Sequence, residues 1–381
     1  MIYVFITLTF VLSVMVARII IPRILLISIK KKLFDVPDSR KVHKGIVPRL
    51  GGVSFFPTVL FSVAFTMAMR YLLDYRMEGF IAQKIVPEAL LFVCGLTLLY
   101  LIGIADDLIG VRYRQKFLIQ IVAAAFLPVS GLWINNFYGL FGIHALPAFI
   151  GIPFTMFLVV FITNAINLID GIDGLASGLS SVALLVFGFL FMHQGLWAFS
   201  MLSFATLGVL IPFFYYNVFG NVNRGRKIFM GDTGSLTLGY IISFLAVTYS
   251  MYDFEVAPYV NSAIVISFSV LIVPMFDVIR VILVRARTGK NIFEPDKNHI
   301  HHKFLAMGLS HKKAMVGIIG MACVFAFVNI ALVSVVNVNV LFVGDIVVWI
   351  GVNVWFDRVR DRKKLKNNLK IADVTNKRTV K

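Results

Sequence analysis

The chain has 381 residues, of which 59% are hydrophobic and 14% charged, and its formal net charge is +17. Charged residues make up roughly 25% of a soluble globular domain, so this composition excludes that class and indicates a protein that crosses a membrane several times. The two cysteines, Cys94 and Cys323, both lie in apolar runs, which indicates buried thiols rather than a disulfide framework or a zinc site.

Long apolar stretches follow one another along the chain, with short polar segments between them. The predicted membrane spans are residues 2–29, 50–73, 85–104, 117–134, 146–166, 175–192, 196–214, 235–252, 258–284, 314–337 and 340–356. The sequence therefore predicts an all-α polytopic membrane protein with about 11 transmembrane helices. An integral membrane domain is expected over 1–356, followed by a basic, mobile cytoplasmic tail over 357–381.

The positive charges fall on one side of these predicted spans. If the first span enters from outside, 33 of the 36 Lys and Arg residues lie on the cytoplasmic side or near it, and Arg70, Arg76 and Lys84 are the exceptions. This asymmetry follows the positive-inside rule and predicts an N-terminus outside and a C-terminus in the cytoplasm. The excess charge is therefore a topology signal and an attraction for anionic lipid, not an indication of nucleic-acid binding.

Acidic and histidine residues gather at the cytoplasmic ends of these spans. The segments are GIADDLIG with Asp106 and Asp107, NAINLIDGIDGLASG with Asn167, Asp170 and Asp173, FMGDTGSL with Asp232, and HIHH with His299, His301 and His302. Neighbouring carboxylates at a membrane boundary repel one another, so each is costly unless a cation lies between them. One such pair is compatible with an interfacial helix end, whereas the whole set indicates a site for a hard cation, and Mg²⁺ fits best.

Glycines and basic residues in the same cytoplasmic segments indicate a phosphate ligand. In MGDTGS and PRLGG the glycines allow backbone N–H groups to approach an anion closely. Lys44, Lys116 and the histidines supply positive donors, and no Walker-type phosphate loop is present. The residues alone therefore predict metal-assisted phosphoryl chemistry on cytoplasmic loops at the inner membrane surface.

With these motifs the chain resembles the polyprenyl-phosphate N-acetylhexosamine-1-phosphate transferases of the glycosyltransferase 4 superfamily. DD at 106–107, NxxNxxDGxDGLA at 164–176, FMGDxGSLxLG at 229–239 and HIHH at 299–302 carry the resemblance. It implies transfer of a sugar 1-phosphate from a UDP-N-acetylhexosamine to undecaprenyl phosphate, with release of UMP, in the bacterial cytoplasmic (inner) membrane. Mg²⁺ is the implied cofactor, with Mn²⁺ as a substitute. Membrane lipid is an implied partner, nucleic acid is not, and a homodimer is left open.

Carried over residue by residue, the resemblance assigns roles to the motif positions. It implies catalytic roles for Asp106, Asp107, Asp170, His301 and His302, and Mg²⁺ coordination by Asp232, Asp107 and Asp170. It implies uridine binding by Asp173, Asn217 and Phe229, and phosphate binding by Lys44, Lys116, Asn167, His299, His301 and His302.

Departures from related branches favour the initiators of O-antigen and teichoic acid synthesis. The lipid I-forming enzymes carry D-D-x-x-K where this chain has Gly110, and three consecutive histidines where this chain has HIHH. A UDP-MurNAc-pentapeptide donor is therefore disfavoured, GlcNAc 1-phosphate is the first expectation, and FucNAc- or GalNAc-type donors stay open. An ion-coupled membrane carrier is the alternative from another class, but carriers place ionisable residues near the membrane midplane.

Asp277, inside the ninth predicted span, has two interpretations. Arg280 follows it one helical turn later, so a structural ion pair is expected. Support of the cytoplasmic site from behind is the second interpretation, and the sequence does not decide between them.

Overall fold

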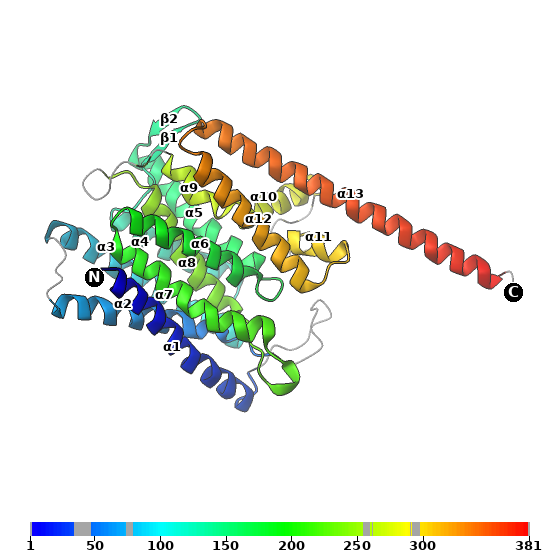
Figure 1. Ribbon diagram of the computed structural model, residues 1–381, viewed down its shortest axis with the longest axis horizontal. Helices are drawn as coiled ribbons and strands as arrows, with labels where there is room; N and C mark the ends of the chain where they lie inside the picture. The colour runs from blue at the N-terminus through cyan, green and yellow to red at the C-terminus, as the bar shows by residue number, and fades with distance from the viewer. Residues whose placement is uncertain are drawn as a thin grey trace.

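The computed structural model describes residues 2–33, 47–73, 79–253, 260, 262–289, 291 and 298–379. Most of the long helices run side by side in roughly one direction (Figure 1). Lys44, predicted to contact phosphate, lies outside the described residues.

The helices follow the predicted apolar stretches closely. The first part of the chain forms α1 (Ile2–Lys30), the 3₁₀ turn η1 (Gly51–Ser54), α2 (Phe55–Leu72), α3 (Gly79–Ile109), α4 (Tyr113–Val129), α5 (Ala148–Ile169), α6 (Leu175–His193) and α7 (Trp197–Phe214). The second part forms the π-helical turn η2 (Tyr215–Phe219), the 3₁₀ turn η3 (Val222–Arg224), α8 (Gly231–Ser250), α9 (Ala263–Ser269), α10 (Ile272–Arg287), α11 (Ile300–Ala306), α12 (His311–Leu332) and α13 (Val338–Thr379). An antiparallel hairpin of β1 (Asn136–Leu140) and β2 (Ile143–Ala145) interrupts the helical pattern.

Eight helices in the described ranges are long and apolar enough to cross a membrane, and the number is nine if α9 and α10 form one span. These two helices meet at 79°, so the ninth predicted span is broken. A span is also predicted at α4 and at α8. Helix α4 has 17 residues and α8 is rich in Gly, Ser and Thr, and neither is among the helices that are long and apolar enough to cross a membrane. The largely helical, multi-pass membrane fold is confirmed, whereas the count of 11 and the orientation of the termini stay predictions.

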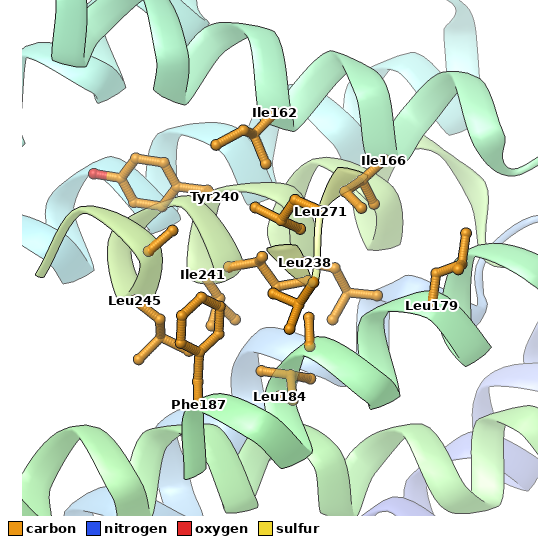
Figure 2. Close-up of a cluster of buried hydrophobic side chains, with 14 of the residues drawn as sticks. Ile162, Ile166, Leu179, Leu184, Phe187, Leu238, Tyr240, Ile241, Leu245 and Leu271 are labelled. Carbon is orange, nitrogen blue, oxygen red and sulfur yellow. The ribbon is translucent and has the colours of Figure 1, made fainter. Parts of the chain in front are cut away.

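Helix α8 forms the centre of the bundle and is buried along nearly its whole length. Figure 2 shows the apolar cluster around it, in which α8 supplies Leu238, Tyr240, Ile241 and Leu245, α5 supplies Ile162 and Ile166, and α6 supplies Leu179, Leu184 and Phe187. Several of its hydroxyl groups bond within the helix, as Thr237 does to the carbonyl of Thr233 at 2.6 Å. A helix enclosed by protein therefore tolerates polar residues, and its fixed position also fixes its first turn, which carries Asp232.

The two cysteines lie on helix surfaces rather than in the core. Cys94 of α3 and Cys323 of α12 are exposed, free thiols. The prediction that they are buried is wrong, because an apolar helix that faces lipid accommodates a small apolar side chain on its outer surface as readily as on its inner one.

Helix α13 continues without interruption from Val338 to Thr379 and passes the predicted domain boundary at 356. Its second half extends beyond the other helices, as Figure 1 shows in red. The residues predicted to begin a separate mobile tail are therefore helical, and Asp357 and Lys363 contact α11 and its C-cap.

Candidate active site

Four segments from three distant parts of the chain meet at the N-terminal end of α8. They are the end of α3, the start of α4, the end of α5 and the first turn of α8. The side chains brought together are Asp106, Asp107, Lys116, Asn167, Asp170 and Asp232. We call this group the carboxylate cluster. That its members bind metal or substrate stays a prediction.

Asp107 holds the N-terminus of α8. Its Oδ1 accepts a hydrogen bond from the backbone N–H of Asp232 (2.8 Å), and its Oδ2 accepts from the N–H (2.9 Å) and the hydroxyl (2.6 Å) of Thr233. The first N–H groups of a helix have no partner within it, and the helix dipole favours a negative charge there. In this arrangement Asp107 fixes the position of Asp232, a role different from the metal ligation that the resemblance implies.

The glycines of two motifs serve close backbone packing. The N–H groups of Gly51 and Gly52 donate to the carbonyls of Phe229 (2.9 Å) and Met230 (2.8 Å). Gly231 has a φ of 72°, and a Cβ there would collide with the Asp107 carboxylate. The N–H groups of Gly51 and Gly52 are therefore already bonded to backbone carbonyls of the protein. Close backbone packing explains why glycine occurs at these positions, and the phosphate ligand that the sequence suggests is not needed to explain it.

Lys116 joins two carboxylates. Its ammonium donates to Asp106 Oδ2 at 2.8 Å and to Asp232 Oδ1 at 2.7 Å, and all three side chains are largely shielded from solvent. The other oxygen of Asp106 accepts from the N–H of Val111 at 2.6 Å. A fixed cation thus lies between carboxylates that would otherwise repel each other.

Asn167 connects α5 to the first turn of α8. Its Nδ2 donates to Asp232 Oδ1 (2.9 Å) and to the hydroxyl of Ser235 (2.7 Å). Asp232 Oδ1 therefore accepts from both Lys116 and Asn167, while no hydrogen bond to its Oδ2 is found among the described residues. The second oxygen is the one available to a ligand.

Asp170 is the carboxylate with the least support. It ends α5, is half-buried, and accepts no hydrogen bond within the described part of the chain. Burial first, and then the neighbouring carboxylates of Asp232 and Asp173, raise its pKa to about 7. A bound cation would stabilise its charged form.

Two carboxylates of the cluster, Asp170 and Asp232, fit Mg²⁺, and Asp107 as a third ligand stays a prediction. Among the residues that the structure describes, no group of three or more Asp, Glu, His or Cys side chains is placed to hold one metal ion. Both oxygens of Asp107 are bonded to α8, which leaves Asp170 and Asp232. Because Mg²⁺ in phosphoryl sites commonly takes one or two carboxylates together with water and phosphate oxygens, this pair suffices.

The residues predicted to bind uridine are joined through Asn217. Its Oδ1 accepts from the N–H of Gly174 (2.7 Å), and its Nδ2 donates to the carbonyl of Ile228 (2.9 Å). The turn that carries Asp173 and the segment that carries Phe229 are thereby held side by side. The amide of Asn217 bonds to backbone groups, so it builds this region, and uridine binding stays a prediction.

Lys227 is a residue of this region that the sequence analysis missed. Its ammonium forms an ion pair with Asp173 Oδ2 at 2.5 Å, and both side chains are mostly buried. The signal in the sequence is a lysine two positions before Phe229, directly ahead of the FMGD motif. Lys227 follows Arg224 and Arg226, and a group of basic residues between two spans is also what the positive-inside rule produces, so nothing singled this lysine out.

Asp277 organises the histidine segment. Its fully buried carboxylate lies 2.9 Å from His299 Nδ1 and accepts hydrogen bonds from the N–H of Ile300 (3.0 Å) and from Arg280 (2.7 Å). The ion pair with Arg280 is therefore confirmed, and the same carboxylate fixes the first turn of α11, whereas support of a functional site stays a prediction.

His301 lies beside the turn that follows Asp170. A Cβ on Gly171 would collide with its ring, and its ring centroid is 4.2 Å from that of His302. Burial first, and then His302 and His299, lower its pKa to about 3, so it is neutral rather than the positive donor that the sequence predicts. Its Nδ1 is buried and has no hydrogen-bond partner among the described residues, so it is available to a polar ligand.

Comparisons with known proteins agree with this arrangement. A family model described as glycosyl transferase family 4 matches residues 89–250, which include the segments of Asp106, Asp170 and Asp232. The chain is 35% identical over 330 residues to a Bacillus subtilis protein named probable undecaprenyl-phosphate N-acetylglucosaminyl 1-phosphate transferase, covering 86% of this chain and 85% of the relative. It is 30% identical over 307 residues to the Yersinia pestis undecaprenyl-phosphate alpha-N-acetylglucosaminyl 1-phosphate transferase, covering 80% and 78%. The Escherichia coli K12 protein of the same name is 29% identical over 307 residues, covering 79% and 77%.

Proposed function

Because the chain belongs to glycosyl transferase family 4, we propose that it transfers N-acetylglucosamine 1-phosphate to undecaprenyl phosphate. The observation that carries the proposal is the carboxylate cluster, in which the ammonium of Lys116 joins Asp106 and Asp232 beside Asp170. Two anionic phosphates have to approach each other in this reaction. Fixed charges lower the barrier by positioning the phosphates and by neutralising their charge.

We propose UDP-N-acetylglucosamine as the donor and direct attack as the mechanism. An oxygen of the acceptor phosphate attacks the phosphorus that carries the sugar, the bond from that phosphorus to the bridging oxygen breaks, and UMP leaves with this oxygen. A phosphate monoester is mainly dianionic above a pH of about 6, so the attacking oxygen needs no strong base. Asp106, whose two oxygens bond to Val111 and Lys116, then orients the lysine toward the acceptor instead of removing a proton.

The remaining residues divide between the diphosphate and the nucleoside. Asp170 and Asp232 would hold Mg²⁺, for which Mn²⁺ is a substitute. When bound, Mg²⁺ neutralises charge on the phosphate oxygens. The unpartnered Nδ1 of His301 would hydrogen-bond to the donor diphosphate, and the Asp173–Phe229 region would bind uridine.

We place the carboxylate cluster on the cytoplasmic side of the bacterial inner membrane, with the N-terminus outside. The concentration of Lys and Arg in segments on one side of the spans supports this orientation. The ion-coupled carrier is disfavoured, because the ionisable groups lie where helices end rather than halfway along them.

UMP release by the purified protein in detergent tests the proposal. Undecaprenyl phosphate, Mg²⁺ and a panel of UDP-sugars are supplied, with an Asp232→Asn variant beside the wild type. Release that needs both lipid and metal, is fastest with UDP-N-acetylglucosamine and is lost in the variant supports the proposal. Faster release with another UDP-sugar would identify that sugar as the donor instead of UDP-N-acetylglucosamine. No release with any UDP-sugar would overturn the proposed reaction.

A buried amide pair links the two helices that hold Asp232. Asn164 Nδ2 donates to Gln120 Oε1 at 2.6 Å. Gln120 follows Lys116 by four residues on α4, and Asn164 precedes Asn167 by three on α5, so each lies on the same helix face as its neighbour. The pair therefore fixes α4 against α5 directly behind the carboxylate cluster.

Replacing Gln120 by leucine is expected to lower kcat about tenfold, because Asn164 keeps only its bond to the carbonyl of Val160 on its own helix and Lys116 is displaced relative to Asn167. The Gln120→Leu/Asn164→Leu double variant, which leaves no unpaired amide, should unfold at a higher temperature than the single variant. Steady-state UMP release and thermal unfolding measure the two effects. Wild-type kcat in the single variant would contradict a positioning role for the pair.

A further inference from the structure

Helix α11, which carries His301 and His302, has seven residues and depends on its neighbours for its position. Isolated helices shorter than about 12 residues are marginal in water. The N-terminal end of α11 is fixed by Asp277 of α10, as described above. The rest of it lies against α12 and α13.

A buried lysine joins α11 to α13. Lys303 is 8% exposed, and its ammonium donates to Asn353 Oδ1 (3.1 Å) and Asp357 Oδ2 (3.0 Å). A buried ammonium needs acceptors, and removing the charged one leaves an uncompensated charge. This contact therefore strongly favours one placement of α11 on α13.

Two further contacts extend the attachment along α11. The rings of Phe304 and Phe356 meet nearly edge-on, with centroids 4.7 Å apart. Lys363 donates to the carbonyl of Met307, the residue that ends α11, at 2.8 Å. A cation at this end also complements the helix dipole.

The α13 residues of these contacts recur at helical spacing and lie on one face. We call the contacts together the α11–α13 latch, formed by Lys303, Phe304 and Met307 of α11 and its C-cap and by Asn353, Phe356, Asp357 and Lys363 of α13. Part of this face belongs to the region beyond 356, which the sequence suggests is a tail without a role in the site. The latch connects it to the histidine segment.

We propose that Asp357 is a positioning residue for sugar-phosphate transfer, holding α11 through Lys303 so that His301 and His302 stay beside the Asp170–Gly171 turn. The proposal rests on the proposed function, in which His301 contacts the donor diphosphate, and on the phosphate-binding role that the resemblance implies for His302. Asp357 directly follows the predicted span 340–356, and it touches α11 rather than the carboxylate cluster.

The effect on turnover follows from where the histidines act. Contacts to the diphosphate that strengthen as the bond breaks contribute to kcat, whereas contacts to uridine contribute to KM. A displaced α11 should therefore lower kcat and leave KM for the UDP-sugar nearly unchanged.

Three variants test the latch. Asp357→Asn removes the charge that Lys303 faces, and Asp357→Glu keeps it. Asp361→Asn is the matched control, because Asp361 lies one turn further along α13, is 63% exposed and pairs with Arg360. We expect Asp357→Asn to lower kcat about tenfold, the loss that accompanies one charge-assisted hydrogen bond, and the other two to stay within about twofold of wild type.

A double-variant cycle distinguishes positioning from general destabilisation. In a His302→Ala background, Asp357→Asn should lower kcat by less than about twofold further, because both changes act through α11. Independent, multiplicative losses would overturn the proposal, as would wild-type kcat in Asp357→Asn alone.

Hydrogen–deuterium exchange of residues 300–306 provides a measurement that does not depend on the reaction. Exchange should rise in Asp357→Asn and stay unchanged in Asp361→Asn. If the wild type releases no UMP, the proposed function is wrong. The exchange measurement still shows whether Asp357 holds α11 in place. Unchanged exchange in Asp357→Asn overturns the latch whatever the activity.

Discussion

Replacing Lys116 by methionine is expected to lower kcat/KM about 10³-fold, as removal of a preorganised donor at a site of developing charge does. Methionine keeps most of the length of the side chain and loses the ammonium. Asp106 and Asp232 then face each other without the cation that lies 2.8 Å and 2.7 Å from them, and the acceptor phosphate meets a more negative site. The initial rate of UMP release at several concentrations of both substrates measures the loss.

Arginine should not rescue this position. The guanidinium is a planar fork that needs more room than the compact ammonium held between two carboxylates, so Lys116→Arg should stay at least about tenfold below wild type. Lys312→Met is the control, since Lys312 is an exposed lysine whose ammonium lies over the ring of Phe219, and its activity should be unchanged. A Lys116→Met enzyme within about threefold of wild type would exclude a direct role for this ammonium.

The location of the carboxylate cluster could be predicted from the sequence because its determinants are local. The apolar stretches fix where helices end, and the Lys and Arg residues indicate which ends share a side. Asp106, Asp170 and Asp232 each lie next to such an end, so their proximity follows from topology without knowledge of the packing.

Side-chain roles could not be predicted, because they depend on partners far away in the chain. Asp107 bonds to N–H groups 125 and 126 residues later, and nothing in the DD motif separates this aspartate from Asp106. The glycines of PRLGG are explained equally well by a phosphate and by a neighbouring backbone, and only the packed structure distinguishes the two.

The contacts of the residues after 356 could not be predicted from the sequence for the same reason. Dense positive charge after an apolar span indicates a solvated tail, and composition carries no information about docking. The contact of Asp357 with Lys303 joins residues that are 54 positions apart, and it becomes visible only when α11 and α13 lie side by side.

Asp170→Asn is expected to make the metal-free protein more heat-stable while lowering kcat at least about 100-fold. The carboxylate of Asp170 accepts no hydrogen bond within the described part of the chain and is repelled by Asp232 and Asp173, so a neutral amide removes an unfavourable charge. The loss of turnover has the opposite origin, because the same charge is one of the two that would hold Mg²⁺. On the proposed function, the site gives up stability for metal affinity.

The difference in stability between Asp170→Asn and the wild type should depend on pH, and the raised pKa of Asp170 sets the direction of this dependence. In the folded protein the carboxyl titrates at about 7, against an ordinary value of 3.8, so the folded state binds the proton more tightly than the unfolded state. Stability of the wild type therefore falls as pH rises from about 4 to about 7 and changes no further from this group above that range. The advantage of Asp170→Asn should be largest at pH 8, about 3 °C in the unfolding temperature, and should shrink toward pH 5.

Adding Mg²⁺ shows whether the stability change in Asp170→Asn comes from the charge at the metal site or from a general effect of the substitution on packing. Metal binding compensates the charge of Asp170, so Mg²⁺ should raise the unfolding temperature of the wild type at pH 8, less at pH 5, and hardly at all in Asp170→Asn. Thermal unfolding followed by tryptophan fluorescence, with Asp361→Asn as an exposed control, gives all of these values without turnover. Equal stabilisation of wild type and Asp170→Asn by Mg²⁺ would remove Asp170 from the metal site and leave Asp232 as its one remaining carboxylate in the carboxylate cluster.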